Sequence, residues 1–202
     1  MRITIRNTFA LLLTMAAVST RPAVAQNTAP NSGAMEPRAH LALGYSYVHS
    51  NAPPGGCGCF NLNGGSASFA WSFKPESWAV VGDVVSGYSG SVSSAGYGLT
   101  LSAFTAGVRY TPPVGHSSLH PFGQVLAGVA HSSGTLVQGS LSATTNAGAA
   151  FAGNFGGGLD LRASRRFSIR LVEADYLLTT FDNGSNNHQN NLRISAGVVI
   201  HF

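Results

Sequence analysis

The last stretch of the chain, residues 191–202, alternates apolar and polar positions with a period of two. One parity carries Leu192, Ile194, Ala196, Val198, Ile200 and Phe202, and the other carries Arg193, Ser195, Gly197, the apolar exception Val199, and His201. Successive side chains of a β-strand point to opposite faces, so the pattern predicts a strand with one apolar and one mostly polar face. Its length suits a tilted strand that crosses a membrane, which needs about 9–11 residues.

The same period of two predicts seven earlier strands. They cover residues 40–48, 66–73, 78–85, 99–110, 122–131, 151–162 and 167–178. The faces of the fifth strand are hard to assign, because Gln124 is its only strongly polar interior position. Long segments rich in Gly, Ser and Asn (51–63, 87–98, 132–149 and 181–190) alternate with shorter connections. This alternation predicts an even-stranded antiparallel meander with short periplasmic turns and long outer loops.

Aromatic residues gather near the strand ends that border the short connections. These residues are Trp71, Phe73, Trp78, Tyr110, Phe122 and Phe167. Aromatic rings at the membrane–water interface form the girdles of membrane barrels, so we expect these side chains to face lipid. Aromatics at the strand ends of a soluble β-sandwich remain the alternative.

The beginning of the chain has the three parts of a secretory signal. Arg2 and Arg6 precede a short apolar run over residues 8–18, and Ala23-Val24-Ala25 forms a cleavage site before Gln26. We therefore expect a signal peptide at 1–25, a flexible periplasmic leader at 26–37, and one β-barrel at 38–202.

Charge is scarce in this chain. Charged residues make up 9% of it, against about 25% in ordinary soluble domains. Three of its eleven basic residues precede the cleavage site, so the mature chain keeps eight basic and seven acidic residues, a net charge near +1. No basic patch indicates nucleic acid as a partner.

Several segments resemble those of small eight-stranded bacterial outer-membrane barrels of the OmpA type. They are the segments 78–83, 156–162 and 170–178, together with the terminal strand. The resemblance implies a closed eight-stranded antiparallel up-and-down transmembrane barrel in the bacterial outer membrane. It also implies outer-membrane lipid and the barrel assembly machinery as partners, with Phe202, Ile200 and Val198 as the C-terminal insertion signature.

Four acids and four arginines lie within the predicted strands. They are Asp83, Arg109, Asp160, Arg162, Arg170, Glu173, Asp175 and Arg193. An Arg or Lys at the lipid-facing midplane costs about 2–4 kcal/mol, so these charges should point inward and pair. Arg170 and Glu173 have opposite parity, so a β-bulge between them is needed to bring both inside. Otherwise Glu173 and Asp175 lie near the rim.

Cys57-Gly58-Cys59 lies in a Gly-rich loop segment. Export to an oxidising compartment predicts a disulfide between the two cysteines, although the small ring would be strained and reducible. A metal site is the weaker interpretation, because no His has suitable spacing to complete it.

An eight-stranded barrel is only wide enough for its own side chains, and a wide aqueous pore needs about 16–18 strands. We therefore expect a non-enzymatic structural or surface-interaction role through the long loops, with a lumen plugged by paired charges and no cofactor. Three alternatives stay open: a lipid A-modifying enzyme using Ser, His and a carboxylate, a narrow pore, and a soluble periplasmic ligand-binding barrel. The sequence alone places no such catalytic trio.

Overall fold

The computed structural model describes residues 38–50, 59–73, 77–90, 98–115, 117–134, 148–181 and 188–202. The predicted signal peptide and leader lie outside these residues, so both stay predictions. The described part consists of β1 (Ala39–Ser50), β2 (Phe60–Phe73), β3 (Trp78–Ser89), β4 (Leu99–Tyr110), β5 (Leu119–Gly134), β6 (Ala149–Arg162), β7 (Phe167–Thr179) and β8 (Gln189–His201). No helix in these ranges is long and apolar enough to cross a membrane.

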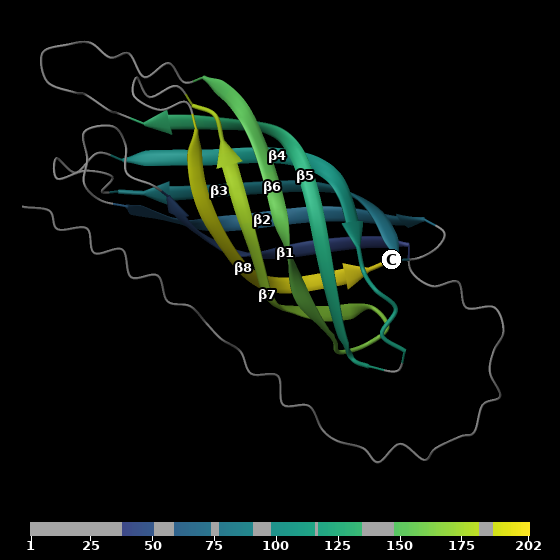
Figure 1. Cartoon of the computed structure of the whole chain (residues 1–202). Helices are drawn as coiled ribbons and strands as arrows, with labels where there is room; N and C mark the ends of the chain where they lie inside the picture. The colour runs from purple at the N-terminus through teal and green to yellow at the C-terminus, as the bar shows by residue number, and fades with distance from the viewer. Residues whose placement is uncertain are drawn as a thin grey trace, which may run out of the picture. The chain divides into compact units, whose positions relative to one another are not determined.

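The eight strands close into an antiparallel barrel in chain order (Figure 1). β1 pairs with β2 on one side and with β8 on the other, so the first and last strands complete the ring. The pairing along this closure runs from His40 opposite His201 to Ser50 opposite Asn191. The predicted eight-stranded up-and-down barrel is confirmed.

Several strands extend further toward the long connections than the sequence predicted. β2 begins at Phe60, so the predicted loop over 51–63 was wrong in its last residues. There Asn63 pairs with Tyr47 of β1, and Gly64 lies so close to β3 that a Cβ would meet the carbonyl oxygen of Ser86. A glycine that looks like a turn signal here permits close strand approach. β3 likewise continues to Ser89, and β5 to Gly134.

The outer surface of the barrel is apolar, and its charges point inward. On β8, Leu192 and Ile194 are 48% and 40% exposed, whereas Arg193 between them is 1% exposed. The same alternation of exposed apolar and buried side chains runs along β3 and β4. A soluble sandwich would bury the apolar parity and expose the arginine, which is the reverse of this arrangement.

The loop end of the lumen is filled by small and aliphatic side chains. We call this set the apolar layer; it consists of Val48, Leu62, Val85, Leu101, Ala103, Ala130, Ala152 and Leu177, and it is contributed by seven of the eight strands. Phe60 and Phe181 pack against it. This layer is not evident from the sequence, because an apolar side chain that faces the lumen cannot be told by residue type from one that faces lipid.

Candidate functional site

The middle of the lumen is occupied by a bidentate ion pair between opposite walls of the barrel. Arg193 of β8 donates from Nη1 to Asp83 Oδ2 at 2.5 Å and from Nη2 to Asp83 Oδ1 at 3.0 Å. Its Nε donates to Ser195 Oγ at 3.2 Å, and that hydroxyl donates to Ser46 Oγ of β1 at 3.1 Å. Parallel N–H···O bonds between Arg and a carboxylate fix orientation as well as charge.

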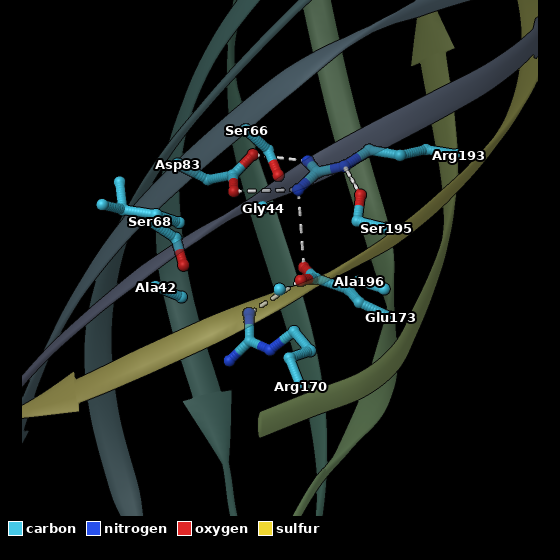
Figure 2. Close-up of a pocket in the computed structure, with 12 residues that line it drawn as sticks. Ala42, Gly44, Ser66, Ser68, Asp83, Arg170, Glu173, Arg193, Ser195 and Ala196 are labelled. Carbon is cyan, nitrogen blue, oxygen red and sulfur yellow. Dashed lines mark hydrogen bonds and ion pairs between the residues drawn. The ribbon is translucent and has the colours of Figure 1, made fainter. Parts of the chain in front are cut away.

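Glu173 of β7 joins this pair to a second arginine. Its Oε2 accepts from Arg170 Nη1 at 2.7 Å, and its Oε1 lies 3.6 Å from Arg193 Nη2. Arg170 in turn makes two hydrogen bonds, of 2.9 and 3.1 Å, to Asp160 of β6. Figure 2 shows the carboxylate of Glu173 between the two guanidinium groups. Each buried carboxylate thereby gains cationic partners that offset its lost hydration.

A β-bulge in β7 brings Arg170 and Glu173 to the same side. The pairing of β7 with β8 shifts register between these two residues. Leu171 and Val172 are consecutive and both exposed, at 45% and 41%. The alternation of inward and outward side chains is therefore interrupted by one extra outward residue. The bulge that the opposite parity of Arg170 and Glu173 required is confirmed.

Gln124 of β5 connects the remaining arginine to the acidic residues. Its Oε1 accepts from Arg109 Nε and Nη2 at 3.1 and 2.7 Å, and its Nε2 donates to Glu173 Oε1 at 2.7 Å and to Asp175 Oδ1 at 3.3 Å. We call Asp83, Arg109, Gln124, Asp160, Arg170, Glu173, Asp175 and Arg193 the lumen network. Gln124 was not predicted to join these charges, because its amide is neutral and the expectation of inward, paired side chains applies to ionised groups.

Phe122 corrects the predicted aromatic girdle. Its ring is buried inside the barrel, with the guanidinium carbon of Arg109 4.3 Å and that of Arg170 4.5 Å from the ring centroid. A ring between two guanidinium groups separates like charges and attracts each of them. Phe122 and Gln124 are two residues apart, so their side chains lie on the same face of β5. The polar Gln124 was therefore the signal in the sequence that Phe122 faces the lumen.

The other predicted girdle residues lie on the outer surface. Trp71, Phe73, Trp78, Tyr110 and Phe167 are all exposed near the turn end of their strands. The rings of Trp78 and Tyr110, cross-strand partners, are 4.9 Å apart. Of the predicted insertion signature, Phe202 is 65% exposed, Val198 also points outward, and Ile200 is half-buried.

A small cavity lies beside the lumen network. A cavity of about 10 Å³ lies among Ser68, Asp83, Arg170, Glu173 and Arg193 (Figure 2), close to the lower limit for a single water molecule. Within the described residues, buried polar atoms without a protein partner include the Ser68 hydroxyl and both amide atoms of Asn154.

Two predicted sites remain predictions. Arg162, the last residue of β6, is half-buried at the turn rim, where its backbone N–H donates to the Ser118 carbonyl at 2.8 Å, and its place in the predicted charge network stays a prediction. Cys59 is exposed, but Cys57 lies outside the described residues, so the disulfide stays a prediction. The described residues contain no group of three or more His, Cys, Asp and Glu that could hold a metal ion.

Histidine and serine side chains meet at the turn end of the lumen, where β1 joins β8. The Nδ1 atoms of His40 and His201 are 2.6 Å apart. His40 Nε2 lies 3.2 Å from Ser72 Oγ, and His201 Nε2 lies 2.7 Å from Ser168 Oγ. One nitrogen of the His pair must donate and the other accept, so this contact links the first strand to the last.

Comparison with known proteins identifies the class through its fold. No model of a known protein family matches the sequence, and no curated protein sequence does. The structure is similar to that of Ail, the attachment invasion locus protein of Yersinia pestis, with 16% identity and a TM-score of 0.56 over 83% of this chain and 100% of Ail. It is similar to Neisserial surface protein A (NspA), with 12% identity and a TM-score of 0.59 over 81% of this chain and 97% of NspA. Ail in complex with the heparin analogue sucrose octasulfate matches with a TM-score of 0.55, at 17% identity over 83% of this chain and 100% of Ail.

With this fold, an apolar outer surface and inward charges, the chain is an eight-stranded outer-membrane β-barrel. Its strands cross the bilayer, and hydrocarbon solvates their outer face.

Proposed function

We propose that this protein is a non-enzymatic surface protein of the outer membrane, whose long loops meet an external partner while its barrel serves as a closed anchor. The observation that carries the proposal is the filled lumen: the lumen network and the apolar layer occupy successive levels of the barrel. Outer-membrane lipid surrounds the barrel, and the barrel assembly machinery inserts it through the C-terminal strand.

Two levels of side chains argue against transport through the lumen. A hydrated solute would have to break the Asp83–Arg193 pair and then pass the apolar layer, where Leu62, Leu177 and Ala130 are fully buried. Breaking a buried ion pair by removing one partner costs about 3–5 kcal/mol. The paired charges therefore close the barrel as well as stabilise it.

The filled lumen also argues against a small-molecule binding barrel and against a lipid A-modifying enzyme, because each of these needs a binding site. A small-molecule binding barrel needs a pocket of roughly 300–1,000 Å³, and the cavity beside Arg193 has about 10 Å³. The close Ser–His contact, Ser168 with His201, is near the short turns and faces inward. A lipid A-modifying site would have to face the outer leaflet at the loop end.

The amino-acid composition of the loops indicates which chemical class of partner they can bind. The connections 51–59, 90–98, 135–148 and 180–188 contain Ser, Asn, Thr and Gly in abundance, a single acid in Asp182, and no Lys or Arg. Ail was crystallised with a sulfated heparin analogue, but loops without Lys or Arg lack the usual partners of sulfate groups. We therefore propose an uncharged polar partner surface that is recognised by side-chain hydrogen bonds.

Replacing residues 136–146 by a short Gly/Ser connection tests this proposal. Both versions of the protein would be expressed in the outer membrane of a non-adherent bacterium, and attachment of the bacteria to cultured host cells would be counted. We expect attachment with the full chain and its loss with the shortened loop, while both barrels show the same gel shift on heating. Stepwise single-channel conductance of the wild-type protein, or altered lipid A masses on expression, would contradict the proposal.

A further inference from the structure

The outer face of the barrel becomes polar near the loop end of β1 to β4. Two rows of cross-strand partners form this area, which we call the polar patch. The first row consists of Tyr45, Gly65, Ser86 and Ser102, and the second consists of Tyr47, Asn63, Tyr88 and Thr100. All eight residues have the outward parity of their strands, and none of the eight is charged.

Gly65 gives the polar patch an open floor of backbone. It pairs with Tyr45 on one side and with Ser86 on the other. An added Cβ at Gly65 would lie 3.6 Å from the Gly44 carbonyl oxygen, which is an ordinary contact, so a side chain would fit here and would point outward. Tyr45 and Tyr88 nearby are each 57% exposed. A glycine within a strand allows a ligand to approach the backbone closely.

The polar groups of the patch orient one another and keep hydrogen-bonding capacity. Tyr45 Oη donates to Asn63 Oδ1 at 2.5 Å, and the hydroxyls of Ser86 and Ser102 are 2.9 Å apart. The contact with Tyr45 uses only the carbonyl oxygen of the Asn63 amide and leaves its N–H donors to a ligand, and the serine contact uses one of the two hydroxyl protons. Neutral groups that donate and accept match the hydroxyl groups of a sugar. A tyrosine ring also offers an apolar face to the C–H groups of a sugar ring.

The spacing along the strands places the polar patch at the outer boundary of the hydrocarbon. Trp78 and Tyr88 are ten residues apart on β3, and a membrane-crossing strand has about 9–11 residues. Trp78 belongs to the girdle at the turn end, so Tyr88 lies at the opposite interface. The next outward residues below the patch, Val84 and Phe104, are apolar and 39% and 51% exposed. A lipid whose acyl chains lie on these two residues therefore has its head group level with the patch.

We propose that the polar patch binds the sugar rings of an outer-leaflet glycolipid. One ring lies over the backbone of Gly65 beside Tyr45, and the Asn63 amide and the serine hydroxyls bind its hydroxyl groups. Continuity of the patch with the lipid-facing surface favours a membrane glycolipid over a free saccharide. This inference rests on the orientation of the barrel with its long loops outward and is independent of what the loops bind. Shortening the loop over 136–146 leaves the patch unchanged, so the two proposals can fail separately.

Native mass spectrometry of the refolded protein tests the proposal. The protein would be released from micelles that contain equal amounts of phosphatidylethanolamine and an acylated glucosamine disaccharide without phosphate groups. We expect the wild type to retain the glycolipid at least fivefold more than the phospholipid. Gly65→Leu, which covers the floor, and Asn63→Leu, which removes the amide, should each lower glycolipid retention at least fivefold. Gel shift on heating verifies that each variant is folded.

Gly82→Leu is the matched control, because Gly82 also points outward on β3 and an added Cβ there would meet open space, but it lies among lipid-facing residues. We expect it to retain the glycolipid within twofold of the wild type. Equal losses from Gly65→Leu and Gly82→Leu would overturn the proposal in favour of general contact with the barrel wall. Equal retention of the two lipids by the wild type would overturn recognition of the sugar. Displacement of the glycolipid by the equimolar disaccharide without acyl chains would overturn the assignment to a membrane lipid.

Discussion

Asp83 and Arg193 are 110 residues apart in the chain, and their side chains form two hydrogen bonds of 2.5 and 3.0 Å across the lumen. β3 and β8 are not neighbours in the barrel. The pair therefore holds opposite walls together through side chains alone, in addition to the backbone pairing around the ring.

Arg193→Ala should destabilise the barrel by about 3–5 kcal/mol, because it leaves buried carboxylates without their partner. We expect a lower temperature for the gel shift on heating and easier unfolding by urea in lipid vesicles. Asp83→Ala combined with Arg193→Ala should cost less than the sum of the single changes, since contacting residues couple. Arg165→Ala at the exposed turn is the control, with an effect within about 0.5 kcal/mol. An unchanged transition temperature for Arg193→Ala would refute the role of the pair.

Deletion of Val172 should leave correct assembly intact, because it removes the extra residue of the bulge and places Arg170 and Glu173 on the same parity of a regular strand. Deletion of Ala174, in the regular part of β7, should prevent correct assembly, because it reverses the faces of Asp175 and the residues after it or forces the strand to slip against β8. The yield of the heat-shifted form separates the two variants. Equal yields would show that the match of parities in β7 does not decide assembly.

Phe122→Leu should lower stability by about 1–2 kcal/mol, because it removes two cation–π contacts and brings Arg109 and Arg170 nearer to direct repulsion. Phe167→Leu, a matched change on the lipid face, should have a smaller effect. Urea unfolding in vesicles measures both free energies. Equal effects of the two substitutions on the free energy of unfolding would mean that Phe122 stabilises the barrel only through its apolar surface area and not through cation–π contacts.

The closure of the barrel can be trapped by a disulfide between positions 40 and 201. Ala39 and Phe202 exchange backbone hydrogen bonds, so His40 and His201 form the adjacent non-hydrogen-bonded pair. Such pairs have Cα atoms about 4.5 Å apart, within the range of a disulfide.

In a background of Cys57→Ser and Cys59→Ser, His40→Cys with His201→Cys should give a covalently closed chain. After full denaturation it would migrate differently with and without reductant. His40→Cys with Val199→Cys is the diagonal control, at about 7–8 Å, and should stay reduced. Failure of the first pair to cross-link under oxidation would argue against the β1–β8 register.

Phe202→Ala should reduce insertion in cells more than it reduces stability. The side chain is 65% exposed, so its removal from a refolded barrel costs little packing. Recognition of the terminal strand by the assembly machinery would depend on it. We expect less heat-shifted protein in outer membranes and near-normal urea unfolding in vesicles. Phe73→Ala serves as the control at the same rim, and equal membrane yields for the two variants would remove the proposed insertion role.

The sequence by itself determined the strand count, the meander and the face of most side chains. Alternation with a period of two fixes which parity meets hydrocarbon, because a charge such as Arg193 can be buried only on the inner side. It also required the bulge in β7, since Arg170 and Glu173 could not otherwise share a face. These conclusions depend on the alternation of side chains within a single strand, which does not depend on the strands beside it.

The tertiary structure alone decided which inward groups meet. The register between strands brings Asp83 to Arg193 and places Phe122 between Arg109 and Arg170, and no local pattern encodes register across a closed ring. It also assembled the apolar layer from residues such as Leu62 and Leu177, which are unremarkable in their own strands. Contacts across the lumen depend on the closure and stagger of all eight strands together, and so they exist only in the folded barrel.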